Sequence, residues 1–272
     1  MENKKNAEKI INFPGPSAVG RDFMLEKLLE KQEDLEKEIG KLLNLKVAIK
    51  TTDRSARNIE LTKKSITEED FTNLVNDGKI FAPYVLESNG KRYGYEPEAF
   101  EGEEGDILLS DASVYQTIDL KEKLGDSLYS VAVVAPRDYR EKNIRDRIES
   151  GNSSESEEEI KARLNLGDAH VALLALMAKE SFAGLIKDDF EKAINRFVSS
   201  KGEDRESRDF IKNFSNSDNA VSLLEKIIKN DTKTIEEFFV RGDADRLPKG
   251  QDFEGSNLQK KLHQIFKNAL LN

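Results

Sequence analysis

Residues 10–22 read IINFPGPSAVGRD, a short apolar run followed by a turn rich in glycine and proline. The apolar run is mostly β-branched or aromatic, so it predicts a buried strand that Pro14 ends. Beyond Arg21, leucine and isoleucine recur at helical spacing to about residue 43. Gly15 and Gly20 therefore lie between a predicted strand and a predicted helix. Phosphate-binding loops of the form G-x4-G occupy this position in other proteins.

The two residues after Gly20 depart from the usual form of that loop. The motif continues with Lys and then Ser or Thr, and here Arg21 and Asp22 take those places. A guanidinium is wider than an ammonium and planar, and Asp22 removes the hydroxyl that normally contacts Mg²⁺. The spacing alone therefore leaves two interpretations open: a phosphate-binding loop, or a strand-to-helix turn that binds no ligand.

Composition excludes several classes of function. Lys and Arg number 43 and Asp and Glu 52, so the formal net charge is −9, which disfavours general binding of nucleic acids or membranes. The absence of cysteine excludes disulfides, thiolate metal sites and a cysteine nucleophile, and two histidines are too few for a multi-histidine zinc site, so no metal ligands are predicted. No apolar run approaches the length of a membrane span and residues 1–9 are polar, so we expect a cytoplasmic protein.

Strand and helix patterns alternate along the first 200 residues. This alternation predicts an α/β fold with a mostly parallel sheet flanked by helices. The polar tract from Ser199 to about Glu206 predicts a boundary between a domain of residues 1–200 and an extension of residues 201–272, in which 210–272 is purely helical. Thr67 and Ser156 are predicted to cap helices, Ser156 with Glu159 in a capping box. Strands are predicted at 10–13, 47–49, 107–109, 128–134 and 185–186, and helices at 25–43, 66–78, 164–176 and 188–197, with two charged helices between 138 and 163.

Six segments, in the same order, resemble the motifs of guanylate kinases. The resemblance runs from about Glu8 to Val198. Residues 15–22 resemble the P-loop Gly-Pro-Ser-Gly-x-Gly-Lys-x, and residues 51–60 resemble Thr-Thr-Arg-x-x-Arg-x-Gly-Glu with one residue inserted before Arg54. The other similar segments are 71–80 to the following helix, 92–94 to Tyr-Tyr-Gly, 147–148 with 159–164 to the lid, and 187–193 to the closing Asn-Asp-Asp-x-x-x-Ala.

The resemblance implies a P-loop nucleotide kinase fold and transfer of a phosphoryl group from ATP, with Mg²⁺, to a small phosphorylated acceptor. This chemistry depends on positioning and on neutralising charge, which suits a site rich in arginine and poor in histidine. Arg147 and Arg163 each also have the simpler interpretation of a solvated helix surface. The implied residues are Gly15, Pro16, Ser17, Ala18, Val19, Gly20, Arg21 and Asp22 for ATP; Arg21, Arg147 and Arg163 for catalysis; and Arg54, Arg57, Lys64 and Tyr93 for the acceptor.

Other positions depart from the guanylate kinase pattern. Ser150 replaces one lid arginine, and Tyr95 replaces a hydroxyl residue that follows Tyr-Gly. The position of the family's guanine-reading carboxylate falls near Ala82, which cannot accept a hydrogen bond from a base. Asp22 and residues 89–94 are instead similar to ribose 1,5-bisphosphate phosphokinases, a branch with the same fold, in which Lys64 would contact a phosphorylated sugar. Three hypotheses therefore stand: a kinase of GMP or a related acceptor, a ribose 1,5-bisphosphate phosphokinase-like enzyme, and an inactive binding module. The oligomeric state is not predicted.

Overall fold

The computed structural model describes residues 5–55, 62–86, 90–151, 154–182, 184–230, 233–245 and 253–271. The chain forms two compact units. The first unit comprises Met1–Phe13, Arg21–Ser130 and Leu247–Asn272, and the second comprises Pro14–Gly20 and Val131–Arg246. The fold is mixed α/β with a mostly parallel sheet flanked by helices, as the alternation of patterns predicts.

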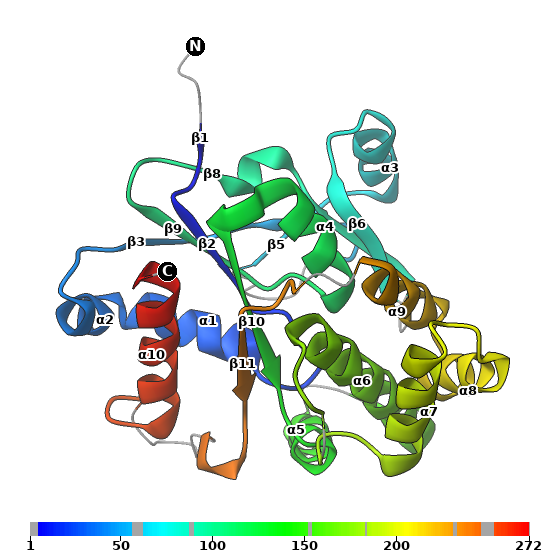
Figure 1. Cartoon of the computed structure of the whole chain (residues 1–272). Helices are drawn as coiled ribbons and strands as arrows, with labels where there is room; N and C mark the ends of the chain where they lie inside the picture. The colour runs from blue at the N-terminus through cyan, green and yellow to red at the C-terminus, as the bar shows by residue number, and fades with distance from the viewer. Residues whose placement is uncertain are drawn as a thin grey trace. The chain divides into compact units, whose positions relative to one another are not determined.

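The first unit is built on parallel strands in the order β10–β2–β9–β3. Ile10 and Ile11 of β2 and Leu109 of β9 are fully buried, which explains why these strands read as continuous apolar runs. Helix α10 lies against α2 in this unit (Figure 1). The elements are β2 (Lys9–Asn12), α1 (Arg21–Glu30), α2 (Gln32–Ile39), β3 (Asn44–Val47), β9 (Asp106–Ser110), α4 (Val114–Leu124), a 3₁₀ turn (Gly125–Ser127), β10 (Leu128–Val134) and α10 (Asn257–Leu271).

A second sheet of the first unit has the order β5–β4–β7–β6. Strands β4 and β5 run parallel, whereas β7 is antiparallel to both β4 and β6. The N-cap of α3 is Thr67, whose Oγ1 accepts the N–H of Asp70 at 3.0 Å, as predicted. The elements are β4 (Lys50–Thr52), β5 (Lys63–Ser65), α3 (Glu68–Asn76), β6 (Phe81–Leu86), β7 (Lys91–Tyr95), a 3₁₀ turn (Pro97–Phe100) and the antiparallel pair β1 (Lys5–Asn6) and β8 (Glu101–Gly102).

In the second unit, residues Val131–Val134 of β10 pair in parallel with β11. Helix α6 is buried along most of its length and contacts α5, α7, α8 and α9 (Figure 1). The predicted capping box of Ser156 and Glu159 is confirmed at the start of α6. The elements are α5 (Arg137–Glu149), α6 (Glu157–Ala178), α7 (Asp188–Ser199), α8 (Arg205–Ser215), α9 (Asp218–Asn230), β11 (Glu237–Val240) and a 3₁₀ turn (Asp243–Asp245).

Three local predictions are wrong. The predicted helix over 25–43 is two helices, because the helical conformation is interrupted at Lys31. The second helix, α2, ends at its C-cap Gly40, which adopts the left-handed conformation. The strand predicted at 185–186 is a bend, and β11 pairs with β10 instead, so residues 210–272 are not purely helical. The strand predicted at 47–49 ends at Val47.

The two units do not divide at residue 200. Residues 201–246 belong to the second unit and residues 247–272 to the first. Among the helices that the structure describes, none is long and apolar enough to cross a membrane.

Candidate functional site

The loop Pro14–Gly20 of the second unit runs against β10. The main-chain oxygen of Pro14 accepts the N–H of Val133 at 2.8 Å. A Cβ at Gly15 would overlap the main-chain oxygen of Val133, so only glycine fits there. This contact fixes the start of the loop at the carboxyl end of a parallel strand, where open α/β sheets bind their ligands.

The far side of the loop has the backbone of an anion-binding concavity. Ala18 and Gly20 have φ values of +67° and +82°, in the left-handed region, and such turns direct successive N–H groups toward one point. Ala18 is the less usual of the two, because a residue with a Cβ is strained at positive φ. Two side chains hold the loop from outside: Nδ2 of Asn143 donates to the oxygen of Ala18 at 2.8 Å, and Nη1 of Arg241 donates to that of Val19 at 2.6 Å.

Of the two predicted lid arginines, the structure brings one to this loop. Nε of Arg163 donates to Oγ of Ser17 at 2.7 Å, and its Nη1 forms an ion pair with Glu155. Arg147 lies exposed on α5 and forms no ion pair with any residue in the described part of the chain. Arg163 is therefore the lid arginine with a direct contact to the loop.

The side chain of Arg21 is committed to main-chain oxygens of the first unit. Its Nη1 donates to the oxygens of Asp111 and Ala112, both at 3.1 Å, and to that of Phe13 at 3.4 Å. Asp22 is exposed in the first turn of α1. The guanidinium that stands in place of the usual lysine thus anchors the end of β9.

A buried cluster of charges surrounds Asp111. Nζ of Lys50 lies 3.0 Å from Oδ1 of Asp111, and Nζ of Lys63 lies 3.6 Å from Oδ2. Burial lowers the pKa of Lys50 to about 8; Asp111 opposes this shift, and the positive charges of Lys63 and Arg21 add to it. Burial alone would raise the pKa of Asp111, but the charges of Lys50, Lys63 and Arg21 lower it. Sequence reasoning missed this cluster; the only signal was that Lys50 directly follows the strand predicted at 47–49.

The predicted acceptor residues do not share one face of the β5–β4–β7–β6 sheet. The register pairs Lys63 with Lys50 and Lys50 with Tyr95, so these residues and Tyr93 point to one face. Lys64 points to the other, where it forms an ion pair with Glu96 at 2.9 Å. Tyr93 is buried and stacks on Tyr84 with ring centroids 5.2 Å apart.

The remaining predicted acceptor residues follow β4. The main-chain N–H of Arg54 donates to Oγ1 of Thr52 at 3.1 Å, which fixes the start of the loop that leaves the sheet. Arg57 lies outside the described residues.

Ala82 and Tyr95, two positions at which the sequence departs from the guanine-reading pattern, are buried in the core. Ala82 has a φ of +49°, and its main-chain oxygen accepts from Nε2 of Gln116 at 2.7 Å. Tyr95 is fully buried with its hydroxyl 2.9 Å from Oγ of Ser110, and burial raises its pKa. Neither side chain offers a carboxylate or a short hydroxyl to a purine edge.

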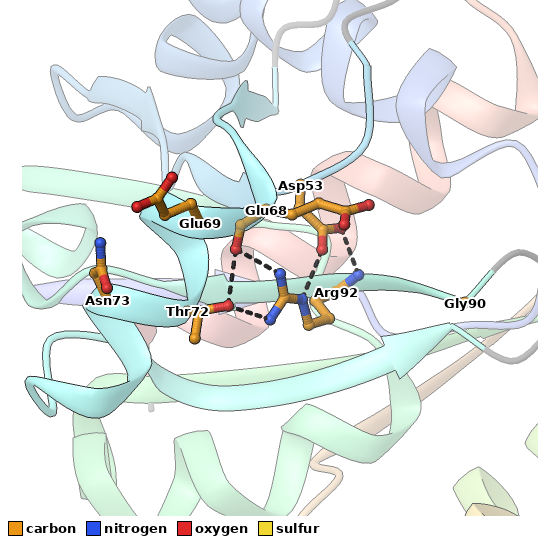
Figure 2. Close-up of a pocket in the computed structure, with 7 residues that line it drawn as sticks. All are labelled: Asp53, Glu68, Glu69, Thr72, Asn73, Gly90 and Arg92. Carbon is orange, nitrogen blue, oxygen red and sulfur yellow. Dashed lines mark hydrogen bonds and ion pairs between the residues drawn. The ribbon is translucent and has the colours of Figure 1, made fainter.

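A pocket of about 540 Å³ opens on the face of the sheet opposite Tyr93 (Figure 2). Arg92 crosses it, with Nε 2.6 Å from Oδ2 of Asp53 and Nη1 2.8 Å from Oγ1 of Thr72. Its donors are thus used within the pocket, and the described residues that line the pocket include none of the predicted site residues. The lining residues are Asp53, Glu68, Glu69, Thr72, Asn73, Gly90 and Arg92.

The described side chains include no group of three His, Cys, Asp or Glu that could hold a metal ion. Mg²⁺ in phosphoryl-transfer sites is held by one or two carboxylates together with substrate phosphates and water. Such a site needs no cluster of protein ligands.

Two curated relatives and one solved structure are similar to this chain. No family model matches the chain. A guanylate kinase of Prochlorococcus marinus is 28% identical over 170 residues, which cover 62% of this chain and 85% of the relative. A guanylate kinase of Lactococcus lactis is 25% identical over 192 residues, covering 69% and 83%. A solved guanylate kinase structure from Anaplasma phagocytophilum is 19% identical, covers 53% of this chain and 68% of that chain, and gives a TM-score of 0.37. The chain is thus similar to two curated guanylate kinases over more than four fifths of their length, at low identity.

Proposed function

We propose that this protein transfers the γ-phosphoryl group of ATP to a small phosphorylated acceptor. The observation that carries the proposal is the loop Pro14–Gly20, in which Ala18 and Gly20 adopt left-handed conformations and Ser17 is contacted by Arg163. A loop of this backbone form binds phosphate through main-chain N–H groups. An arginine at its rim adds the charge-assisted hydrogen bonds that phosphate oxygens accept best.

The residues present fit the phosphates of ATP better than they fit a fixed metal site. The main chain of residues 15–20 would hold the β- and γ-phosphates, and Arg163 would exchange its bond to Ser17 for one to a phosphate oxygen. Bound ATP supplies the phosphoryl group, and Mg²⁺ neutralises charge on its phosphates. The arginine positions the group and stabilises charge that develops during transfer, which removes the need for a histidine or cysteine.

The acceptor is expected to be anionic. The cluster sets the buried Lys50 and the partly buried Lys63 and Arg21 against the carboxylate of Asp111. Lys50 and Lys63 point to the face of the β5–β4–β7–β6 sheet that also carries Tyr93. An excess of buried positive charge is costly unless an anion compensates it. Ala82 and Tyr95 offer no purine-reading group, so GMP and a sugar bisphosphate such as ribose 1,5-bisphosphate are both candidates for the acceptor.

The test is a turnover assay. Purified protein receives Mg-ATP with GMP, dGMP, AMP or ribose 1,5-bisphosphate, and release of ADP is measured beside calorimetry of ATP binding. The expected result is ADP release that depends on one acceptor. No release with any acceptor, together with no heat of ATP binding, would refute the kinase proposal.

A second candidate, a binding module that holds nucleotide without turnover, is favoured by Arg21. Its guanidinium donates to the main-chain oxygens of Phe13, Asp111 and Ala112. A loop without its cation loses charge neutralisation more than it loses main-chain contacts to phosphate. ATP binding without turnover would select this candidate, and turnover gained by Arg21→Lys would identify a decayed enzyme.

A further inference from the structure

Arg241, from the segment after β11, is buried beside the loop Pro14–Gly20. Its side chain is 4% exposed, and its guanidinium donates from Nη1 to the oxygen of Val19 at 2.6 Å and from Nη2 to that of Asp245 at 3.0 Å. The guanidinium also lies 5.7 Å from the ring centroid of Tyr139. Burying a guanidinium costs desolvation free energy. The buried guanidinium of Arg241 donates hydrogen bonds that orient two main-chain oxygens.

The contact with Val19 determines the direction of the next amide. A trans peptide is planar, so its carbonyl and its N–H point to opposite sides. Because Arg241 holds the oxygen of Val19, the N–H of Gly20 is turned away from Arg241. Asn143 holds the oxygen of Ala18 at 2.8 Å, and so it directs the N–H of Val19 in the same manner. Two side chains behind the loop thus orient two successive donors toward its other side.

The sequence of the loop is matched to this arrangement. A Cβ at Gly20 would overlap Nη1 of Arg241, so the glycine makes room for the guanidinium as well as permitting a φ of +82°. Ala18 lacks the freedom of glycine yet has a φ of +67°, and the bond from Asn143 helps to hold this strained residue. The loop is therefore held by side chains that follow it by more than 120 and 220 positions.

We propose that Arg241 is a positioning residue for nucleotide phosphates: it pre-orients the loop that receives the polyphosphate of a nucleoside triphosphate. The proposal rests on the proposed function of the loop. It makes the segment after β11, part of the predicted C-terminal extension, a component of the nucleotide site. It also assigns to Arg241 the anchoring of the loop, while Arg21 anchors the end of β9.

The test compares Arg241→Gln and Arg241→Lys with the wild-type full chain. Calorimetry measures affinity for inorganic tripolyphosphate, for Mg-ATP and for adenosine, which carries no phosphate. Loss of the charged donor is expected to weaken binding of tripolyphosphate and of ATP by on the order of tenfold. This is the change in affinity that corresponds to the free energy of one hydrogen bond from a charged group. Arg241→Lys should recover part of the loss, because an ammonium still reaches one oxygen. Adenosine binding should not change.

Arg208→Gln is the matched control, since this arginine of the second unit is partly exposed and pairs with Glu225. It should leave all affinities unchanged. Should Arg241→Gln fail to fold, Asn143→Ala tests the same arrangement and is expected to weaken tripolyphosphate binding. Wild-type affinity for tripolyphosphate in a folded Arg241→Gln or Asn143→Ala variant would overturn this inference alone. A wild-type chain that binds neither ATP nor tripolyphosphate would instead overturn the proposed function on which it rests.

Discussion

Nε of Arg163 donates to Oγ of Ser17 at 2.7 Å, which joins helix α6 to the loop Pro14–Gly20 across 146 residues of sequence. The same guanidinium pairs with Glu155, which precedes α6. Arg163 is therefore held at the loop before any ligand arrives, with its charge balanced by a carboxylate. A phosphate oxygen is a stronger acceptor for this guanidinium than the hydroxyl of Ser17.

Replacement of Arg163 by lysine should impair transfer more than folding. The fork of donors that spans a phosphate is lost while the charge stays, and we expect kcat to fall by about 100-fold, the usual cost of one donor to developing charge. Steady-state ADP release measures this. Arg145→Lys on α5, where the arginine pairs with Glu141 and Glu157, is the control and should retain wild-type kcat. Equal kcat in Arg163→Lys and wild type would contradict the assignment.

Neutralising Glu155 should have the opposite effect on nucleotide binding. Its carboxylate competes with phosphate for the guanidinium of Arg163, and both side chains are partly exposed. Glu155→Gln is therefore expected to tighten Mg-ATP binding by about threefold, the scale of a partly exposed ion pair. Calorimetry gives the affinity, with Glu157→Gln as the control. Weaker binding in Glu155→Gln would show that this carboxylate orients Arg163 rather than competing for it.

The buried carboxylate of Asp168 is expected to matter for stability. It has no exposed surface and pairs with both Arg140 and Arg137, which joins α5 to α6. Asp168→Asn leaves two arginines without their countercharge, and we expect the free energy of unfolding to fall by about 3–5 kcal/mol. Urea unfolding measures the change. The control is Glu141→Gln, which removes the partly exposed ion pair between Glu141 and Arg145 on α5. A loss as small as that of the control would mean that water compensates the arginines.

Local patterns predicted the parts of the fold that depend on local chemistry. The strand before Pro14 and the caps at Thr67 and Ser156 are confirmed because each depends on residues within one turn of the chain. The strand β11 was missed because its four residues gain their pairing only from β10, about 100 positions earlier. A run this short has no periodicity that separates it from the surrounding helices.

The candidate site divides in the same way. The motifs placed Ser17 and Arg163 in one predicted site, and the structure brings these two side chains into contact. Lys64 and Tyr93 were grouped from sequence, but they lie on opposite faces of the sheet, because a shift of one residue reverses the side to which a strand residue points. Arg241 had no motif to mark it, since its role depends on a contact made only in the folded chain.

Lys50 should give the protein a distinctive dependence of stability on pH. Burial lowers its pKa to about 8 from an ordinary 10.5. Below pH 8 both the folded and the unfolded chain hold the proton, so the contribution of Lys50 is constant and unfavourable. Between about pH 8 and 10.5 the unfolded chain holds the proton and the folded chain does not, so the free energy of unfolding rises with pH.

Lys50→Met removes this titration. Relative to Lys50→Met, the wild type is expected to gain on the order of 2 kcal/mol between pH 7.5 and pH 10, according to the linkage between pKa and stability. Urea unfolding at several pH values measures the difference, and Lys79→Met, at an exposed lysine paired with Asp77, serves as the control with no such change. Parallel pH profiles for wild type and Lys50→Met would mean that Asp111 holds the proton on Lys50 throughout this range, because Asp111 opposes the effect of burial.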